Sequence, residues 1–580
     1  MSMHDDIRRQ LMWSRLIAVV EEQARMLMLT AFSATVREAG DLSAGVFDLR
    51  GRMVAQAITG TPGHVNSMAE AVPHFLKEFP IAEMVEGDHF ITNDPWIASG
   101  HLHDITVVSP VFRNGKPLGF FSCTCHQVDI GGMGQGPDGR SVFEEGLYIP
   151  PMHLARGGTP NGDLLRLIRA NVRQPKMVEG DVLSYVTTNE ASGRRLVKML
   201  DEFGEQGLEE LADWIFQRSK NAMIAEIRKL PRGTYENELV LDGYDKPVKL
   251  KAALTVGEDD IRVDYTGSDP ASPHGINVVL NYCKAYSAFG VRCVVAPRVP
   301  NNAGSLAPII VTAPEGSIVN VKHPWPVSAR HVIGQFLPDV MLGCLAKAVP
   351  ERIPAEGAAC LWGAQLRGGP SVAAGAPTES NRFGEPFEVM FFNSGGSGGR
   401  PFADGMNATA FPSGVRALPC EVVETVAPVV IWKKELRGDS GGAGRYRGGL
   451  GQTVEVGTID GAAFAFFAMF DRVKSQPRGR RGGANGTSGR VETASGAKLR
   501  AMGLQVVPAD ERLRLSLPGG AGYGDPLERP PARVAADVAD GIIAREAAAR
   551  DYGVVLAESG AVDEAATAKL RAQRAQRPSA

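Results

Sequence analysis

Histidine is concentrated in one part of this chain, where it stands beside aspartate. Of the eleven histidines in 580 residues, five lie close together in the sequence: His89, His101, His103, His126 and His153. The stretch GHLHDI contributes His101, His103 and Asp104, and the stretch CTCHQVDI contributes His126 and Asp129. Neutral imidazole and carboxylate groups are common ligands of divalent metals. A metal site is therefore the favoured interpretation, with a catalytic base or a solvated polar loop as the alternatives.

A β-hairpin would bring the two stretches together. The segments that carry them have the pattern of strands, and the residues between them, Asn114 and Gly115, are a strong signal for a two-residue hairpin turn. That turn places Asp104 opposite residue 125, and one β-bulge would move His126 into register with Asp104. Because His and Asp side chains converge from two paired strands, the metal site is favoured over the solvated loop.

A second polar motif, made of Asn93, Asp94 and Pro95, comes just before this cluster. Asp94 could orient a metal ligand or activate a water molecule as a general base. The alternative is an Asx-type turn before Pro95, because an Asp side chain readily bonds to the backbone two residues on. Both interpretations stay open at this point.

The elements that must position these residues are helices and strands in alternation. Apolar spacing of three and four predicts helices over 14–39 and 195–229. Alternating patterns predict a hairpin over 43–56 and further strands over 234–268. After a Gly/Pro turn, a helix is expected to begin with Asn66 or Ser67 as its N-cap.

The predicted fold class is mixed α and β (α+β), with antiparallel strand hairpins and helices. We expect three regions along the chain. They are a metal-bearing N-terminal region at 1–230, a Gly/Pro-rich mixed region at 231–525 and a helical C-terminal tail at 526–580.

Charge and hydropathy exclude several classes of protein. The formal net charge is −3, which argues against nucleic-acid binding. The apolar run at 461–470 is too short for a membrane span, which needs about twenty residues. The N-terminal residues lack the apolar segment of a secretion signal. We therefore expect a cytoplasmic protein without nucleic-acid or membrane partners.

The cysteines give no sign of a disulfide framework, because the seven are scattered and odd in number. Cys123 and Cys125 precede His126 in the stretch CTCH, which suggests a zinc site. Side chains alternate along a strand, so these two cysteines would point away from the face that carries His126. Buried, reduced cysteines are favoured over metal ligands.

Three glycine-rich segments, at 395–400, 439–453 and 478–486, look like phosphate-binding loops. None has the Lys followed by Ser or Thr that a P-loop needs, and none lies between a clear parallel strand and a helix. The favoured interpretation is tight turns where backbones approach closely. Loops that contact an anionic substrate are the alternative.

The stretch ITNDPWIASGHLHDITVVSPVF resembles the hydantoinase B/oxoprolinase family. Further blocks similar to that family follow in order along the chain: EEGLYIPP, PRGTYE, VDYTGS, VPNNAGSLAPI, APEGSIVN, DSGGAGRYRGGLG and LPGGAGYGDP. The resemblance extends over residues 10–555, and so many ordered blocks argue against chance.

The resemblance implies the B-type subunit of an ATP-dependent enzyme. A hydantoinase A-type partner, similar to sugar kinases and actin-like ATPases, would bind and use ATP, in a hetero-oligomer expected to be a dimer of heterodimers. The B-type subunit would carry a divalent metal, zinc or manganese, and complete the opening of a cyclic amide: a hydantoin, 5-oxoproline or a lactam. Two alternatives stay open, namely a subunit of an ATP-dependent ketone carboxylase (acetone or acetophenone) and a scaffolding subunit whose metal is structural.

Carried onto this sequence, the family's metal ligands match His101, Asp104 and His126. Two histidines and one carboxylate leave coordination positions open, as catalytic metal sites do. Asp94 is the candidate general base beside them.

Four further residues are candidate contacts to the substrate or to the metal ligands. His64, in PGHVNSM, matches a family histidine, and His103 stands where the family usually has proline. Because proline cannot bind a metal, His103 is expected outside the ligand set. Asn93 and Asp129 complete this group.

Overall fold

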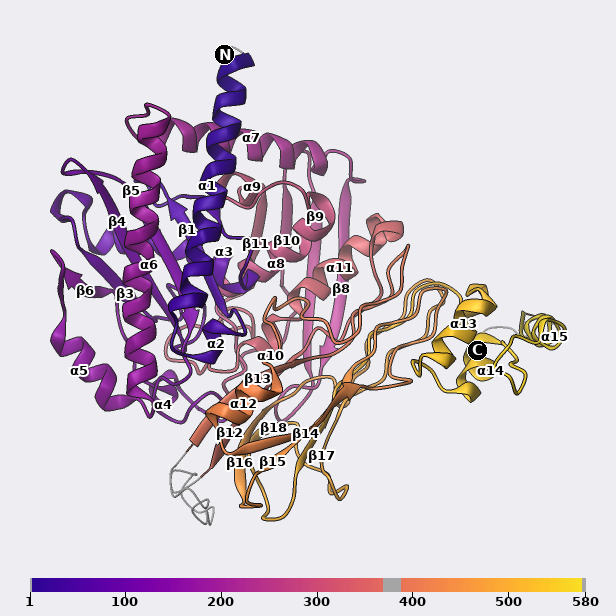
Figure 1. Cartoon of the computed structure of the whole chain (residues 1–580). Helices are drawn as coiled ribbons and strands as arrows, with labels where there is room; N and C mark the ends of the chain where they lie inside the picture. The colour runs from indigo at the N-terminus through magenta and orange to yellow at the C-terminus, as the bar shows by residue number, and fades with distance from the viewer. Residues whose placement is uncertain (1–2, 369–386, 576–580) are drawn as a thin grey trace. The chain divides into compact units, whose positions relative to one another are not determined.

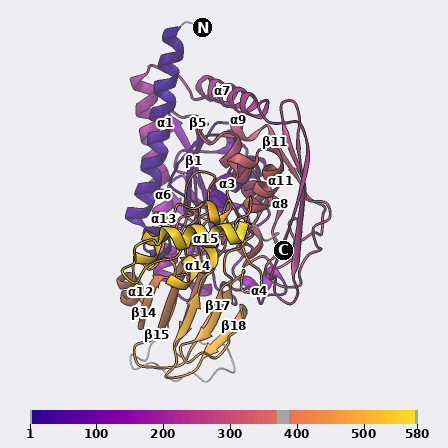
Figure 2. The ribbon, with the colours of Figure 1, turned by 90° about the vertical axis from the view of Figure 1, so that its right-hand side faces the viewer.

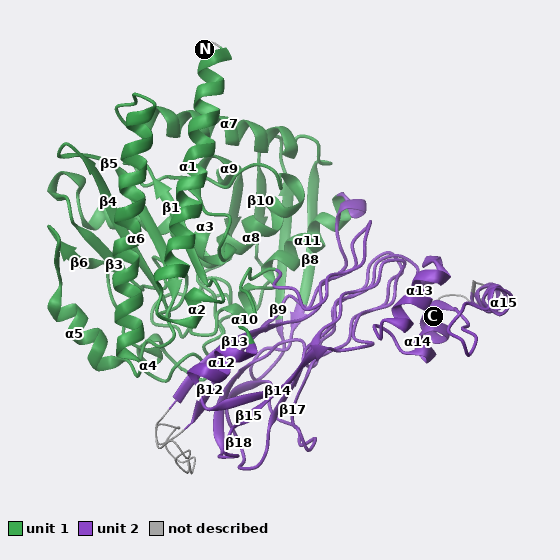
Figure 3. Cartoon of the chain, viewed as in Figure 1, with its two compact units in different colours: residues 1–239, 249–348, 412–419 green, residues 240–248, 349–411, 420–580 purple. Residues whose placement is uncertain are grey.

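The computed structural model describes residues 3–368 and 387–575, which form two compact units (Figure 3). The segments of unit 1 are 1–239, 249–348 and 412–419, and those of unit 2 are 240–248, 349–411 and 420–580. Each unit is thus built from segments far apart in the sequence. The fold is mixed α and β with largely antiparallel sheets, which confirms the predicted fold class.

Unit 1 contains a seven-stranded antiparallel sheet in the order β2-β1-β5-β4-β3-β6-β7. Its strands are β1 (Leu42–Phe47), β2 (Met53–Gln56), β3 (His89–Thr92), β4 (Asp104–Arg113), β5 (Lys116–His126), β6 (Met152–Arg156) and β7 (Thr159–Pro160). The hairpin β4–β5 lies in the middle of the sheet. Asn114 and Gly115 turn it with φ angles of 53° and 74°, the left-handed values that the predicted turn requires.

Helices cover both faces of this sheet. They are α1 (Met3–Thr30), α2 (Ala34–Arg37), α3 (Pro62–Glu78), α4 (Val142–Glu145), α5 (Gly162–Asn171), α6 (Pro175–Glu202) and α7 (Glu209–Ile227). α1 and α6 lie side by side on one face (Figures 1 and 2), where Val46 and Phe121 join their apolar cluster. α3 packs on the opposite face with Phe47 and Phe120. Successive side chains of β1 and β5 point to opposite faces of the sheet, so these two strands contribute to the apolar core on each face.

A second sheet of unit 1 has the order β11-β10-β9-β8, with β10 and β11 parallel. Its strands are β8 (Gly233–Leu241), β9 (Val248–Val256), β10 (Ile261–Asp264) and β11 (Ile309–Thr312). The helices that follow in this part of the chain are α8 (Leu280–Val295), α9 (Ala303–Leu306), α10 (His331–Gly334) and α11 (Leu337–Ala348). Burial alternates along β9, so one face of this sheet is packed and the other is partly open to solvent.

Unit 2 contains two four-stranded antiparallel sheets, ordered β13-β12-β16-β18 and β14-β15-β19-β17. The strands are β12 (Leu361–Gly368), β13 (Phe387–Ser394), β14 (Val429–Leu436), β15 (Gln452–Thr458), β16 (Phe464–Met469), β17 (Arg490–Thr493), β18 (Met502–Val507) and β19 (Leu513–Ser516). Its helices are α12 (Cys420–Val426), α13 (Pro531–Ala539), α14 (Arg545–Tyr552) and α15 (Glu564–Ala575).

The glycine-rich segments of unit 2 are places where backbones pack against each other. A Cβ atom on Gly448 would lie 1.9 Å from the carbonyl oxygen of Gly520, and one on Gly396 would lie 1.9 Å from that of Gly449. No other residue fits such an approach. The close backbone contact favoured from the sequence is therefore confirmed.

Several predicted helix boundaries are wrong. The helix predicted over 14–39 begins at Met3 and ends at Thr30. The helix predicted over 195–229 is interrupted after Glu202, where Gly204 has a φ of 67°. α3 begins at Pro62, which suits the first turn of a helix, so the predicted N-caps at Asn66 and Ser67 lie inside it.

The cysteine prediction is confirmed, because all seven cysteines are free thiols. Cys123 and Cys125 are buried in the apolar core of unit 1. Among the described residues, no helix is long and apolar enough to cross a membrane.

Candidate metal centre

The hairpin β4–β5 places Asp104 directly opposite His126. The pairing of these strands shifts by one residue between Val111 and Phe112, close to the turn. Without that irregularity, Asp104 would face Cys125. The single β-bulge that the sequence argument needed is therefore present, and it sets the register of the site.

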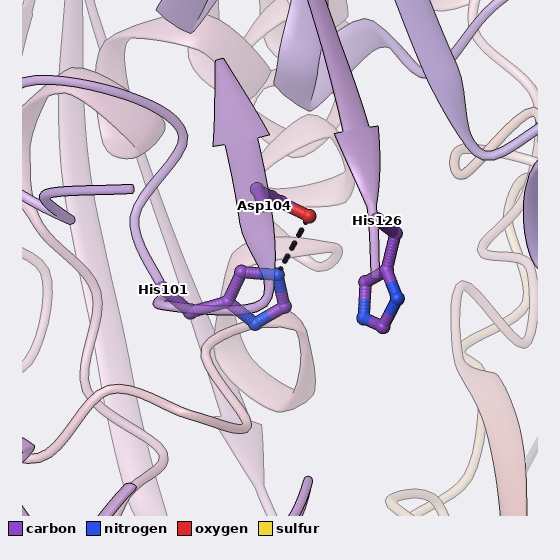
Figure 4. A group of neighbouring side chains, drawn as sticks. All are labelled: His101, Asp104 and His126. Carbon is purple, nitrogen blue, oxygen red and sulfur yellow. Dashed lines mark ion pairs between the residues drawn. The ribbon is translucent and has the colours of Figure 1, made fainter. Parts of the chain in front are cut away.

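His101, Asp104 and His126 each offer one ligand atom, and these three atoms lie within 4.8 Å of one another (Figure 4). Nε2 of His101 is 2.9 Å from Oδ1 of Asp104, and the rings of His101 and His126 have centroids 5.2 Å apart. All three side chains are buried. Among the described residues this is the only group of three or more His, Cys, Asp or Glu side chains with such spacing.

Four polar atoms of this group have no hydrogen-bond partner outside it. Nε2 of His101, Oδ1 of Asp104 and both ring nitrogens of His126 are buried without a partner in hydrogen-bond geometry. Buried polar groups are normally satisfied, and leaving them unsatisfied is costly. A divalent cation bound to these atoms would satisfy them, so the donor set fits a metal ion.

The imidazoles of the group are held neutral. Burial lowers the pKa of His101, and Arg330 lowers it further. Burial also holds the pKa of His126 well below the usual range. Neutral imidazole is the form that binds a metal, so the two histidines are prepared as ligands near neutral pH.

Asp104 is surrounded by groups that stabilise its negative charge. Its Oδ2 accepts hydrogen bonds from Ser99 Oγ at 2.5 Å and from a guanidinium nitrogen of Arg330, and it lies 3.0 Å from Nε2 of His64. Burial opposes ionisation, but His101, His64 and Arg330 together hold the pKa of Asp104 well below its usual range. Asp104 is therefore a carboxylate with Oδ1 directed at the imidazoles.

His64 connects Asp104 to a second buried carboxylate. Its Nδ1 lies 3.6 Å from Oδ1 of Asp41, which also accepts a hydrogen bond of 2.9 Å from Thr61 Oγ1. Burial alone would lower the pKa of His64, but the charges of Asp104 and Asp41 raise it. The structure thus brings His64 to the site.

His101 is oriented by a loop far away in the sequence. Its Nδ1 donates a hydrogen bond of 2.9 Å to the carbonyl oxygen of Ser328, which leaves Nε2 facing Asp104. The backbone N–H groups of Val327 and Ser328 both donate to Oε1 of Glu145, at 2.7 and 2.8 Å. Outer partners of this kind fix the tautomer and the ring position of a metal-binding histidine.

His103 lies beside the group without joining it. Its ring centroid is 5.5 Å from those of both His101 and His126, and its ring is stacked on that of His126. Both ring nitrogens of His103 are buried without hydrogen-bond partners. Burial holds the pKa of His103 well below the usual range.

Asn93 and Asp129 brace the surrounding backbone. The amide of Asn93 donates to the carbonyl oxygens of Leu102 and Leu147. Asp129 forms an ion pair of 2.7 Å with Arg173. The structure does not place either residue in the group of ligand atoms.

Asp94 forms the Asx-type turn that the sequence offered as an alternative. Its Oδ1 accepts a hydrogen bond of 2.8 Å from the backbone N–H of Trp96. Burial and a hydrogen bond to Asp94 raise the pKa of Tyr148 above its usual range. Asp94 thus has a structural task, and it lies outside the group of ligand atoms.

Comparison with known proteins identifies the family. The family model described as hydantoinase B/oxoprolinase matches residues 5–526. The chain belongs to the hydantoinase B/oxoprolinase family. The predicted resemblance is therefore confirmed.

Two curated relatives are similar over nearly their whole lengths. The B-type subunit of a putative D-/L-hydantoinase from a Pseudomonas species is 28% identical, over 98% of each chain. The beta subunit of caprolactamase from Pseudomonas jessenii is 29% identical, over 95% of this chain and 96% of that one.

Two solved structures share the fold. The ATP-dependent caprolactamase from Pseudomonas jessenii has a TM-score of 0.89 at 27% identity, over 98% of this chain and all of that one. Acetone carboxylase has a TM-score of 0.85 at 21% identity, over 99% of this chain and 84% of that one, which shows likeness of fold alone.

Sequence reasoning missed the residues that reach the centre from distant segments. Arg330 is 226 positions from Asp104, and Glu145 and Asp41 come from other parts of unit 1. None of them lies in a motif with metal-ligand spacing. Only the family block that contains Glu145 could have drawn attention to this residue.

Proposed function

We propose that this chain is the metal-bearing B-type subunit of an ATP-dependent cyclic-amide hydrolase. The observation that carries the proposal is the buried group of His101, Asp104 and His126 in a chain of the hydantoinase B/oxoprolinase family. Their ligand atoms have no hydrogen-bond partner outside the group. The relatives named as subunits of a hydantoinase and of a caprolactamase support ring opening of a cyclic amide.

His101, Asp104 and His126 would hold a divalent metal, and their mixture of imidazole and carboxylate suits zinc or manganese. Such a metal supplies a Lewis acid that polarises a carbonyl or phosphoryl oxygen or lowers the pKa of bound water. Two histidines and one carboxylate leave positions for substrate or water.

The chain's own residues prepare this centre for binding. Ser328 orients His101, and Arg330 keeps Asp104 ionised. His103 has two unpartnered ring nitrogens beside the group, and we assign it a contact to the substrate. Asp94 is retained as the proposed general base, acting in addition to its role in the Asx-type turn.

ATP would be used by a second subunit. The amide bond of a ring is stabilised by resonance, and transfer of a phosphoryl group to its oxygen would activate it. The glycine-rich segments of this chain lack the P-loop residues and serve as close backbone contacts. We assign the phosphoryl chemistry to a hydantoinase A-type partner, in a dimer of heterodimers.

Ketone carboxylation is the second candidate from the sequence, but no specific observation favours it. The likeness to acetone carboxylase at 21% identity concerns the fold. The relatives above 25% identity that have named activities include a caprolactamase and a hydantoinase. Cyclic-amide hydrolysis is therefore the function proposed.

The test is to purify the chain with its A-type partner and to assay ATP-dependent opening of a panel of lactams, hydantoins and 5-oxoproline, with and without bicarbonate. Ring opening without bicarbonate supports the proposal. A carboxylated product that forms only with bicarbonate and a ketone would overturn it. Full activity after complete removal of the metal would show that ring opening does not need the metal, whose role would then be structural.

A further inference from the structure

Unit 1 contains a cavity of about 440 Å³ that is separate from the metal centre. It lies between α1, α3, the C-terminal part of α8 and the loop at 297–301. Its lining combines aromatic and aliphatic side chains with amides and two arginines: Trp13, Ile17, Val65, Phe289, Gln56, Asn66, Asn301, Arg292 and Arg298. None of the described side chains that line it is acidic.

Arg292 stands at this cavity without a carboxylate partner. It donates one hydrogen bond to Oδ1 of Asn301 and another of 2.5 Å to the carbonyl oxygen of Val299, both neutral acceptors. Its Nε is buried and has no hydrogen-bond partner. Burial lowers the pKa of the guanidinium to about 10, which still leaves it charged at neutral pH. Arg292 is half-buried, so its guanidinium is held by neutral acceptors and can still bind an anionic partner from the cavity.

The amide acceptors beside Arg292 are already in use. Nδ2 of Asn301 donates to Oε1 of Gln56 and to Oδ1 of Asn66, at 2.7 Å each. Oδ1 of Asn301 is occupied by Arg292. A second donor on the lining, Nε1 of Trp13, is buried and also lacks a partner. The cavity therefore offers the positive charge of its arginines, while its amide oxygens are taken.

The rest of the lining is apolar. Trp13 is 5% exposed, and Ile17, Val65 and Phe289 share the cavity wall with it. Guanidinium groups bind carboxylates through paired N–H donors, and apolar walls favour a hydrocarbon body. From this arrangement we propose that the cavity binds a small organic acid, with its carboxylate at Arg292 and its apolar body against Trp13 and Phe289.

The cavity and the metal centre lie on different sides of the same turn of α3. Val65 and Asn66 line the cavity, whereas His64 reaches Asp104. No residue that lines the cavity belongs to the ligand group of the metal centre. The acid site is thus an additional site, and its existence does not depend on the reaction at the metal centre.

The test measures binding of hexanoate to the full chain by ligand-observed NMR, with hexanamide and inorganic phosphate as comparison probes. Hexanoate is expected to bind the wild type at least about tenfold more tightly than either, because only it has both the charge and the apolar body. Arg292→Met should weaken hexanoate binding about tenfold or more. Arg298→Met should weaken it less, and Arg228→Met, an exposed arginine outside the cavity, should leave it unchanged.

Three results with hexanoate would overturn the proposal. They are absence of hexanoate binding to the wild type, equal binding of hexanoate and hexanamide, and equal binding by Arg292→Met and the wild type. Phosphate bound as tightly as hexanoate would also contradict it, since the apolar wall would then contribute nothing. If Arg292→Met does not fold, Arg292→Lys keeps the charge but loses the paired donors, so it should bind hexanoate more weakly than the wild type and still more tightly than it binds hexanamide. Equal binding of hexanoate and hexanamide by a natively folded Arg292→Lys would contradict a charge-based site.

Discussion

Asp104 and His126 face each other across β4 and β5 because β5 carries one extra residue near the hairpin turn. A strand pair without that bulge would place Cys125, a buried thiol of the apolar core, in front of Asp104. A shift of one residue in the pairing thus decides which side chain faces the Asp104 carboxylate: the imidazole of His126 or the thiol of Cys125.

The first prediction concerns His126. His126→Ala should lower metal affinity by at least about 100-fold, because it removes a ligand from a three-residue set. Metal content per chain, measured by mass spectrometry after dialysis, checks this. His153→Ala is the matched control: His153 packs against Phe79 and Phe90 outside the ligand group, and its variant should keep the metal. Full occupancy in a folded His126→Ala protein would exclude His126 as a ligand.

His103 should prove separable from the metal. His103→Pro and His103→Ala should keep metal content near that of the wild type and lose only part of the ring-opening activity, whereas His101→Ala should lose both. The reason is that the ring nitrogens of His103 lie outside the group of ligand atoms. Metal analysis and activity assays of the three variants decide the matter. Equal metal loss in the His103 and His101 variants would make His103 a ligand.

Arg330 should be important for stability. Arg330→Met removes the cation from a fully buried pair with Asp104, which typically costs about 3–5 kcal/mol of unfolding free energy. The control, Arg228→Met, breaks an exposed pair with Asp259 and should cost far less, because solvent screens a surface pair. Urea titrations of the two metal-free variants provide the comparison. Equal costs would mean that the buried pair contributes no more than a surface pair.

Glu145 should make stability depend on pH. Burial raises its folded-state pKa from the ordinary 4.5 to about 8. The folded protein therefore binds this proton more tightly than the unfolded chain, so its contribution is complete below pH 4.5 and is lost as the pH rises through about 8. In that window stability should fall by up to about 1.4 kcal/mol per pH unit.

Glu145→Gln tests that dependence, because an amide keeps an acceptor for Val327 and Ser328 and does not titrate. The variant should unfold at a higher urea concentration than the wild type at pH 8.5 and show little difference at pH 5. An unchanged difference between the two proteins across this range would show that Glu145 is already ionised in the fold.

The hairpin could be predicted from the sequence, because local signals specify its turn. Its register could not, because the turn alone places Asp104 opposite Cys125 and no local signal indicates the bulge between Val111 and Phe112. The turn residues Asn114 and Gly115 specify the hairpin, and strand alternation separates Cys125 from His126. The partners of Asp104 could not be predicted in this way. Arg330 arrives through tertiary folding from 226 positions away, and no periodic pattern identifies which arginine will be buried.

Breaks in helices and fully buried helices could not be predicted from the sequence either. Gly204 ends the long α6 with a left-handed φ, but a single glycine inside an apolar pattern is often tolerated. α11 is buried along most of its length, so it lacks the polar stripe that makes a surface helix recognisable.

The central claim is that the group of His101, Asp104 and His126 holds a metal that ring opening requires. The most direct measurement is ATP-dependent opening of the preferred cyclic amide by the chain and its A-type partner, after chelation and again after zinc or manganese is restored. We predict loss of activity on chelation, recovery with metal in the wild type, and no recovery in His126→Ala. Ring opening at the full rate by a complex shown to be free of metal would contradict the claim.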